Sequence, residues 1–254
     1  MAGEERNLNN SVALVTGGGS GVGLKTAELL CAAGCKVMLL GSNADKLVKA
    51  VDKLPKDQAT SYAGDVRNSN SAEAAIKEAT EEFSRPVNIL VNNAGTILRS
   101  NAADTSDDDW AYVMDVNVNG VIYCSRAFAN QKKLNGGAIV NVSSTCGQVG
   151  AAGLAAYCTS KGAVDQLTKT MALELASEQI TVNAVAPGAI NSPMLYSKQA
   201  KGVNNQDVID RNLESIPLGT IAEAEEVARA IVFLAKQQHI TGTILSVDGG
   251  YTAC

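Results

Sequence analysis

A tyrosine and a lysine stand four residues apart in the segment AAYCTSKGAVDQLTK, residues 155–169. On a helix, the phenol of Tyr157 and the ammonium of Lys161 would share one face. A free tyrosine has a pKa near ~10, and a neighbouring cation favours its phenolate form. Lowering that pKa by ~3 units takes about 4 kcal/mol of differential interaction. The pair therefore predicts a phenol that exchanges a proton near neutral pH, although ordinary helices also carry this spacing.

A glycine-rich segment, TGGGSGVG at residues 16–23, follows the first run of apolar residues. Glycine lets a backbone turn tightly and approach a ligand closely. Where such a loop joins a strand to a helix, the free N–H groups of the helix N-terminus bind a pyrophosphate. Gly17, Gly21 and Gly23 therefore predict a dinucleotide site, with a plain tight turn as the alternative reading.

The second apolar run ends in LLGSNADKL, at a position where proteins that bind NAD usually carry an acidic residue. Here the position holds Gly41, Ser42 and Asn43, so no carboxylate is present to repel a 2′-phosphate. Ser42 and Asn43 can hydrogen-bond such a phosphate, and Lys46 can pair with it. The segment favours NADP over NAD, although Ser42 and Asn43 are also typical turn and N-cap residues.

Short apolar runs alternate with helix-length segments along the whole chain. Most of the runs lack polar residues, as is typical of strands that are covered on both faces. The alternation predicts an α/β fold with a parallel sheet and helices on both sides. The expected strands are 12–15, 37–40, 59–62, 87–91, 138–142, 180–185 and 243–247, and the expected helices are 23–33, 71–82, 106–130, 155–177 and 223–235.

The least regular stretch of the chain is the long, polar segment 194–217. Segments of this length without regular structure are usually functional when they occur inside a compact domain. The segment therefore predicts a lid over a substrate site, with a simple surface excursion as the alternative.

Composition narrows the class of protein. The 254 residues suffice for one α/β domain, and a net charge of −5 without a block of Lys or Arg argues against nucleic-acid and anionic-membrane surfaces. Six scattered cysteines indicate a reducing compartment, and the single His239 argues against a histidine-rich metal site or a Ser-His-Asp triad. No segment resembles a signal peptide, and no apolar run approaches the ~18 residues of a membrane span. We expect a soluble, cytoplasmic protein.

Several short motifs occur in a fixed order along the chain: TGGGSGVG at 16–23, GDV at 64–66, NNAG at 92–95, DVNVNG at 115–120, NVSS at 141–144, YCTSK at 157–161, VNAVAPGAINSPM at 182–194 and VDGG at 247–250. With these motifs the chain resembles the short-chain dehydrogenase/reductase family over nearly its whole length. The resemblance implies a single domain with a Rossmann-type, doubly wound, parallel seven-stranded sheet. It also implies hydride transfer between a nicotinamide and an alcohol or carbonyl group.

The resemblance implies a role for each of four residues. Tyr157 would be the catalytic acid/base, and Lys161 would lower its pKa and bind the nicotinamide ribose. Ser144, thirteen positions before the tyrosine, would hold the substrate oxygen. Asn117 would hold a water molecule beside the lysine. No metal ion is required for this chemistry.

The resemblance also implies a set of cofactor-binding residues, comprising the phosphate loop, the adenosine end and the nicotinamide end. Two positions depart from the usual family pattern, since Ser192 replaces Thr and Asn88 replaces Asp. We expect neither change to stop catalysis. The implied residues are Gly17, Gly19, Ser20, Gly21, Val22, Gly23, Ser42, Asn43, Asp65, Val66, Asn92, Ala94, Gly95, Tyr157, Lys161, Pro187, Gly188, Ile190 and Ser192.

Substrate residues are expected around the catalytic serine and in the lid. They are mostly small or apolar, which predicts a pocket without a charged anchor unless a lid cation, Lys198, Lys201 or Arg211, contributes one. Reductases of carrier-linked acyl groups often carry Arg just before ITVN, where this chain reads ASEQ. The sequence therefore favours a free small molecule such as a ketone, a polyol or a sugar-derived carbonyl. The expected substrate residues are Thr145, Cys146, Gly150, Ala151, Leu154, Met194 and Tyr196.

The favoured function is that of an NADPH-dependent carbonyl reductase. The alternatives are an NAD-dependent polyol, sugar or alcohol dehydrogenase and a 3-oxoacyl-carrier-protein reductase. A non-catalytic cofactor sensor and a sugar-nucleotide epimerase or dehydratase remain as readings from other classes. The resemblance further implies a homotetramer that pairs the helices expected at 106–130 and 155–177.

Overall fold

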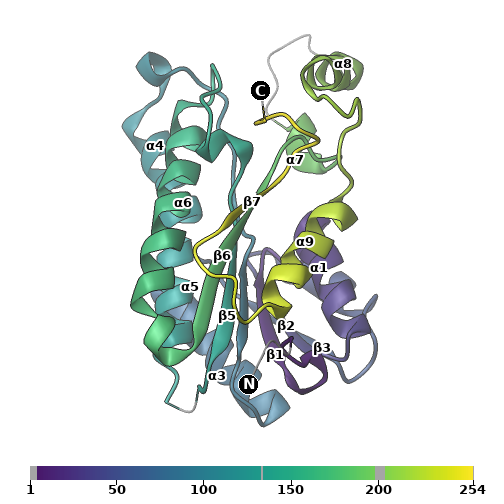
Figure 1. Cartoon of the computed structure of the whole chain (residues 1–254), viewed down its shortest axis with the longest axis vertical. Coiled ribbons are helices and arrows are strands. Elements are labelled where there is room, and N and C mark those ends of the chain that lie inside the picture. The colour runs from purple at the N-terminus through teal and green to yellow at the C-terminus, as the bar shows by residue number, and fades with distance from the viewer. Residues whose placement is uncertain (1–4, 133, 198–203, 254) are drawn as a thin grey trace.

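The computed structural model describes residues 5–132, 134–197 and 204–253. Its centre is one parallel sheet of seven strands in the order β3-β2-β1-β4-β5-β6-β7 (Figure 1). The predicted doubly wound, seven-stranded fold is therefore confirmed. The strands are β1 (Val12–Thr16), β2 (Lys36–Gly41), β3 (Ala59–Ala63), β4 (Ile89–Asn92), β5 (Gly137–Val142), β6 (Ile180–Pro187) and β7 (Ile244–Val247).

Two layers of helices cover the sheet, one on each face (Figure 1). Alternate residues of β1 enter opposite cores: Ala13 and Val15 pack in the core beneath one layer, and Val12 and Leu14 in the core beneath the other. This double coverage explains why most of the strands read as mainly apolar runs. The first layer comprises α1 (Gly21–Ala32), α2 (Ala44–Val51) and α9 (Ala224–Lys236); the second comprises α3 (Ser69–Phe83), α4 (Asp107–Met114), α5 (Gly120–Ala129) and α6 (Ala155–Glu174).

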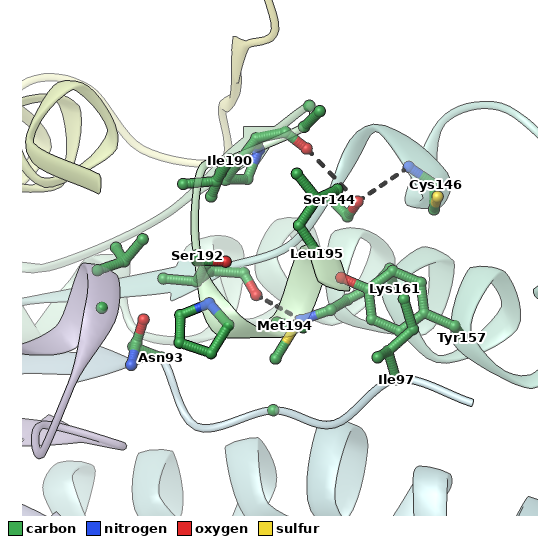
Figure 2. A pocket seen from close by; sticks show the side chains of 18 of the residues that line it. Asn93, Ile97, Ser144, Cys146, Tyr157, Lys161, Ile190, Ser192, Met194 and Leu195 are labelled. Atoms are coloured by element: carbon green, nitrogen blue, oxygen red, sulfur yellow. Dashed lines mark hydrogen bonds between the residues drawn. The ribbon is translucent and has the colours of Figure 1, made fainter. Parts of the chain in front are cut away.

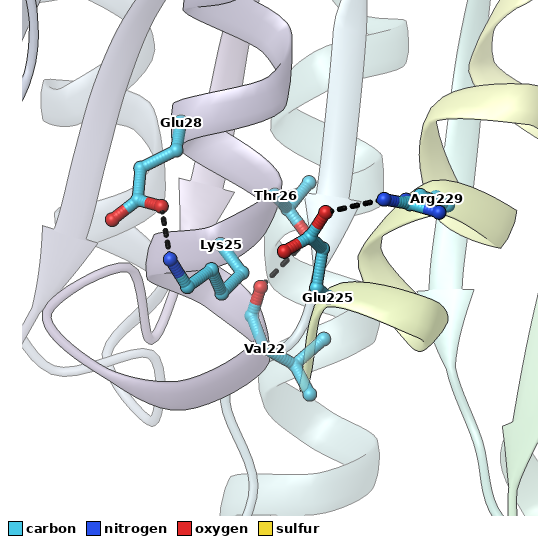
Figure 3. A network of polar contacts seen from close by, with 6 residues as sticks. All are labelled: Val22, Lys25, Thr26, Glu28, Glu225 and Arg229. Atoms are coloured by element: carbon cyan, nitrogen blue, oxygen red, sulfur yellow. Dashed lines mark hydrogen bonds and ion pairs between the residues drawn. The ribbon is translucent and has the colours of Figure 1, made fainter. Parts of the chain in front are cut away.

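Helices α1 and α9 lie side by side, and their exposed faces carry polar contacts (Figure 3). Lys25 pairs with Glu28 on α1 at 2.6 Å, and Arg229 pairs with Glu225 on α9 at 2.6 Å. Both pairs join residues on a single helix and are partly exposed, so each contributes little to stability. The buried apolar faces of the two helices hold them against the sheet.

Three helical features differ from the sequence prediction. The expected helix at 106–130 is interrupted by one π-helical turn, Asp115–Asn119, between α4 and α5. Helix α2 was not predicted, because only Leu47 and Ala50 on its surface are buried. The segment 194–217, predicted to lack regular structure, contains α7 (Pro193–Tyr196) and α8 (Asn205–Ser215). The side chains of Asn204 and Asp207 form a capping box at the N-terminus of α8.

Helices α7 and α8 lie beyond the carboxyl ends of the strands, at the upper end of the molecule in Figure 1. In parallel α/β sheets, ligands bind outside the carboxyl ends of the strands. The expected lid therefore lies at the edge of the sheet where a ligand site belongs. The lid lysines 198 and 201 lie outside the described residues. Within the described residues, no helix is long and apolar enough to cross a membrane.

Candidate active site

A cavity of about 750 Å³ opens at the carboxyl edge of the sheet and runs from the glycine loop to the lid. Of the residues predicted from the sequence, it is lined by the phosphate-loop glycines Gly17, Gly19 and Gly21, by Ser144, Tyr157 and Lys161, and by Ser20, Val22, Ser42, Asn43, Ala94, Gly95, Thr145, Cys146, Ala151, Leu154, Pro187, Gly188, Ile190, Ser192 and Met194. Most of the predicted site is therefore brought together around one space.

The glycine loop is held against the segment that follows β4. Gly17 has φ +64°, and a Cβ there would lie 2.9 Å from Asn93 Nδ2. Gly23 does not line the cavity; a Cβ at that position would lie 2.5 Å from both Asn93 Nδ2 and the Gly17 carbonyl oxygen. Both positions therefore require glycine, Gly17 for its backbone conformation and Gly23 for close packing.

Two residues that the sequence analysis did not assign, Thr16 and Asn93, connect these segments. The hydroxyl of Thr16 accepts hydrogen bonds from the backbone N–H groups of Asn93 and Ala94, at 3.0 and 2.9 Å. The Asn93 amide donates to the carbonyl oxygens of Thr16 and Gly17 at 3.0 and 3.3 Å. The sequence could have identified both residues, because Thr16 is the first residue of the glycine motif and Asn93 lies within NNAG.

Tyr157 and Lys161 project from α6 into the cavity (Figure 2), and the Lys161 ammonium lies 5.7 Å from the centre of the Tyr157 ring. The ammonium donates a hydrogen bond to the carbonyl oxygen of Val142 at 2.7 Å. It has two further donors, since an ammonium carries three N–H groups. Lys161 is only 5% exposed, so its long side chain is fixed between α6 and β5.

Burial is the largest influence on the pKa values of this pair. Burial raises the pKa of Tyr157 to about 12, although the nearby Ser144 hydroxyl opposes that rise. Burial also lowers the pKa of Lys161 to about 8. Desolvation therefore opposes ionisation of the phenol more strongly than its polar neighbours favour it. The prediction that Lys161, together with the positive charge of an oxidised nicotinamide, lowers the pKa of Tyr157 stays a prediction.

Ser144 lies at the end of β5, on the same side of the cavity as Tyr157 (Figure 2). Its hydroxyl accepts a hydrogen bond from the backbone N–H of Cys146 at 3.2 Å and donates to the Pro187 carbonyl oxygen at 3.4 Å. The long second bond leaves the hydroxyl proton available to a substrate oxygen. Burial raises the pKa of the Cys146 thiol to about 11, so this cysteine stays a neutral packing residue, as expected.

Asn117 lies in the π-helical turn, buried behind the cavity rather than on its surface. Its side-chain oxygen accepts from the Thr96 backbone N–H at 2.8 Å, and its amide donates to the Thr96 carbonyl oxygen and to Ser160 Oγ at 2.9 Å. These bonds join the π-helical turn to the loop that follows β4 and to α6. In this structure Asn117 therefore holds the protein segments around Lys161 in place.

Other predicted residues also lie outside the cavity lining. The buried amide of Asn92 donates to Ser125 Oγ and Asn141 Oδ1, at 3.0 and 2.9 Å, so it joins β4 to its neighbours. Asp65 is occupied by Arg67, whose guanidinium approaches to 2.6 Å and lowers the pKa of the carboxyl. Val66, Gly150 and Tyr196 also do not line the cavity.

The adenosine end of the cavity is lined by Gly41, Ser42, Asn43 and Lys46. Asn43 caps helix α2, because its side-chain oxygen accepts the Lys46 backbone N–H at 2.9 Å. Asn43 is therefore an N-cap residue, as the alternative interpretation of the sequence predicted. The amide NH₂ of Asn43, the Ser42 hydroxyl and the Lys46 ammonium remain as donors at this end.

The substrate end carries two charged side chains. Arg211, one of the lid cations named in the sequence analysis as a candidate anchor, lines it, and so does Arg99, which the sequence analysis did not name. Glu178 and Gln179, whose identity argued against carrier-linked substrates, precede β6 at the opposite edge of the sheet. They therefore say nothing about the mouth of this cavity within one chain.

A nicotinamide dinucleotide fits the residues that line this space. The positive φ angles of Gly17 and Gly21, and the absence of any heavy atom within 4 Å of a Cβ built at Gly21, leave a cradle open at the N-terminus of α1. Such a cradle suits a pyrophosphate. Lys161 has donors left for ribose hydroxyls in the middle of the cavity. Fold and site together define a dinucleotide-dependent oxidoreductase that acts on alcohol and carbonyl groups.

Comparison with known proteins agrees. A family model described as enoyl-(acyl carrier protein) reductase matches residues 17–252. Galactitol 2-dehydrogenase from Cereibacter sphaeroides is 38% identical over 96% of each chain. The 3-oxoacyl-acyl-carrier-protein reductase from Vibrio cholerae is 37% identical over 96% of this chain and 98% of its own. A solved candidate gluconate dehydrogenase from Agrobacterium tumefaciens superposes with a TM-score of 0.90 at 28% identity, covering 98% of both chains. The chain belongs to the short-chain dehydrogenase/reductase family.

Proposed function

We propose that the protein is an NADP(H)-dependent enzyme that interconverts a small-molecule ketone and the corresponding secondary alcohol, with reduction of the carbonyl as the favoured direction. One observation carries the proposal: Ser144, Tyr157 and Lys161 line a single cavity that continues to the glycine loop. In that arrangement a substrate oxygen can reach a hydroxyl donor and a phenol at once.

Each residue has a defined task in the proposed reaction. When bound in this cavity, a nicotinamide would supply or accept the hydride at the substrate carbon. In reduction, Ser144 donates a hydrogen bond to the carbonyl oxygen, and Tyr157 gives that oxygen its phenolic proton. In oxidation the phenolate takes the proton back from the alcohol. Lys161, as an ammonium, stabilises the phenolate that each reduction leaves behind.

The preference for NADP(H) is supported by the donors at the adenosine end. Lys46 lines the cavity, and no Asp or Glu lies among the described residues that line it. We expect NADPH to bind more tightly than NADH in fluorescence titrations of the apo protein. Lys46→Gln should weaken NADPH binding and leave NADH binding unchanged. Lys49→Gln, on an exposed residue of the same helix that does not line the cavity, is the matched control. Tighter binding of NADH would contradict the cofactor proposal.

A second candidate function is an NAD-dependent dehydrogenase of polyols or sugars. Two relatives named as polyol or diol dehydrogenases favour it. One is galactitol 2-dehydrogenase, and the other is a meso-2,3-butanediol dehydrogenase from Serratia marcescens, which is 36% identical over 97% of this chain and 96% of its own. Reductases of 3-oxoacyl carrier protein are equally similar. Initial rates with free ketones, polyols and a 3-oxoacyl carrier protein, each with both nucleotides, separate these candidates.

Catalysis itself is tested by Tyr157→Phe, which removes the proposed acid/base. Loss of turnover with retained NADPH binding is expected. If the variant keeps its turnover, or if a partner-dependent role proves to be the only activity, the protein is a cofactor sensor and the enzyme proposal fails.

We also propose a homotetramer. Large apolar side chains are exposed on α4 and α6, where Trp110, Tyr112 and Leu173 are 38%, 43% and 82% exposed. Such exposed residues on neighbouring helices suit an interface between subunits. Light scattering behind a sizing column measures the mass directly. A monomer would contradict the proposal, and Leu173→Glu should dissociate the assembly if α6 forms the interface.

A further inference from the structure

Four cations and no carboxylate line the cavity, counting only the described residues: Lys46, Lys161, Arg99 and Arg211. The protein as a whole carries a net charge of −5, so the positive charge of the cavity lining is opposite to the net charge of the chain. Lys46 lies at the adenosine end and Lys161 in the middle. Arg99 and Arg211 lie at the substrate end, beyond the reach of the proposed dinucleotide roles.

Arg99 is held rigidly beside the catalytic residues. Its guanidinium donates to the carbonyl oxygens of Leu195 and Ser197, at 3.1 and 3.2 Å. The next residue, Ser100, forms a β-bridge with Leu154, which directly precedes α6 and lies less than one helical turn before Tyr157. Arg99 interacts electrostatically with the Tyr157 phenol, so the guanidinium lies within reach of the reacting end of a substrate.

Arg99 has no counter-charge in the described part of the chain. It forms none of the ion pairs present there, and burial lowers the pKa of its guanidinium. Five N–H groups belong to a guanidinium, and two of them donate to the two carbonyl oxygens. Arg99 is half-buried, so its charge is partly removed from water, and we expect a ligand to supply the anion that the described residues do not.

Arg211 approaches the same end of the cavity from the lid. It lies on α8, where Val208, Asn212 and Ser215 also face the cavity. Its side chain is exposed at the mouth and forms no ion pair with a described residue. A ligand anion at Arg99 would therefore lie between a fixed guanidinium on one wall and a second one on the lid.

We propose that the substrate is a hydroxy acid, or the corresponding oxo acid, whose carboxylate is bound by Arg99 with support from Arg211. The planar guanidinium matches a carboxylate with two parallel N–H···O bonds, and such bonds are the strong ones in proteins. The inference rests on the proposed function, since it assigns the substrate class of that same site. It replaces the neutral ketones and polyols that the sequence favoured.

The test uses matched pairs of substrates that differ only in the anion. D-gluconate is compared with D-glucitol, and 3-hydroxybutyrate with 1,3-butanediol, where CH₂OH replaces the carboxylate. We expect the native enzyme to prefer the acid of at least one pair, by kcat/KM. Arg99→Gln should reduce this preference roughly 100-fold, as loss of a charge-assisted bidentate contact implies. Arg99→Lys keeps the positive charge but loses the planar guanidinium, so its preference for the acid should lie between those of the native enzyme and Arg99→Gln.

Two controls keep the test decisive. Arg85→Gln removes an exposed arginine far from the cavity and should leave the preference unchanged. Calorimetry of each acid with the NADP⁺-loaded protein measures binding without turnover and should show the same dependence on Arg99. Equal kcat/KM for acid and neutral partner, or acid binding that survives Arg99→Gln, overturns the inference. In that case turnover of the neutral alcohols leaves the proposed function standing, whereas no turnover of any alcohol or ketone rejects the proposed function itself.

Discussion

Replacing Lys161 by methionine should make the protein more stable while destroying its proposed activity. Lys161 is 5% exposed, and burial lowers its pKa from 10.5 to about 8. Because one pKa unit corresponds to about 1.4 kcal/mol, keeping this ammonium buried costs about 3 kcal/mol at neutral pH. The favourable effect of Asp165 on the same helix is already contained in that pKa.

Lys161→Met removes this cost and keeps the length of the side chain. It also removes the hydrogen bond to the Val142 carbonyl oxygen, which contributes about 1 kcal/mol. The free energy of unfolding at pH 7 should therefore rise by about 2 kcal/mol. For a chain of this size, that corresponds to a rise in Tm of roughly 4–8 °C.

The pH dependence of this gain follows from the sign of the lysine pKa change. The unfolded chain binds the Lys161 proton up to about pH 10.5, and the folded chain releases it near pH 8. The cost of the buried ammonium is therefore complete below pH 8 and fades as the pH rises towards 10.5. Near pH 10.5 the variant should be the less stable protein by about 1 kcal/mol, because only the lost hydrogen bond remains.

The measurement is the Tm of both proteins in a series of buffers between pH 7 and pH 10.5. Lys169→Met, which changes an exposed lysine on the same helix, should shift Tm little at any pH and serves as the control. A Tm for Lys161→Met that is equal to or below the native value at pH 7, with a difference that does not change with pH, would refute the reasoning. It would mean that the folded protein offers this ammonium a compensating partner.

Three further substitutions test the catalytic and phosphate-binding parts of the site. Ser144→Ala should lower kcat roughly 10²-fold through loss of a positioned donor, as measured by steady-state rates. Tyr157→Phe should lower kcat roughly 10³-fold in both directions, since it removes the acid/base; a pH profile that keeps its native shape would contradict this role. Gly23→Ala should abolish NADPH binding in a fluorescence titration, because the new Cβ would lie 2.5 Å from Asn93 Nδ2, whereas Gly162→Ala, with its nearest contact at 3.6 Å, should retain it.

The sheet was predictable because most of its strands are buried on both faces and read as mainly apolar runs. The sequence predicts all seven strands, including the more polar and less buried β3, with boundaries displaced by at most two residues at either end. The helices α2 and α8 were harder. Helix α2 is amphipathic but only eight residues long, and α8 buries only Val208, so neither shows an apolar stripe long enough to be distinguished from a loop by sequence.

The site was predictable where a motif fixes the backbone, and unpredictable where tertiary packing decides. The motif residues Ser144, Tyr157 and Lys161 meet as expected because β5 and α6 place them at one edge of the sheet. Asn92, from an equally recognisable motif, turns into the protein instead. No sequence motif marks Arg99 as a site residue. Its position in the cavity depends on the β-bridge of the neighbouring Ser100 and on hydrogen bonds to two carbonyl oxygens that are 96 and 98 residues away in sequence.

Pairwise spacing also could not reveal the resting state of the acid/base. An ammonium 5.7 Å from the Tyr157 ring stabilises a phenolate by about 3 kcal/mol at an effective dielectric constant of 20. A fall in pKa from about 12 to near 7.5 takes about 6 kcal/mol. Lys161 can thus supply about half of the required stabilisation, and only while it is protonated. The rest must come from hydrogen bonds and charges that arrive with the ligands, including bonds that hold Lys161 as an ammonium. For the proposed reaction it follows that the phenol needs a ligand beside it, as well as Lys161, before it can act as a base near neutral pH.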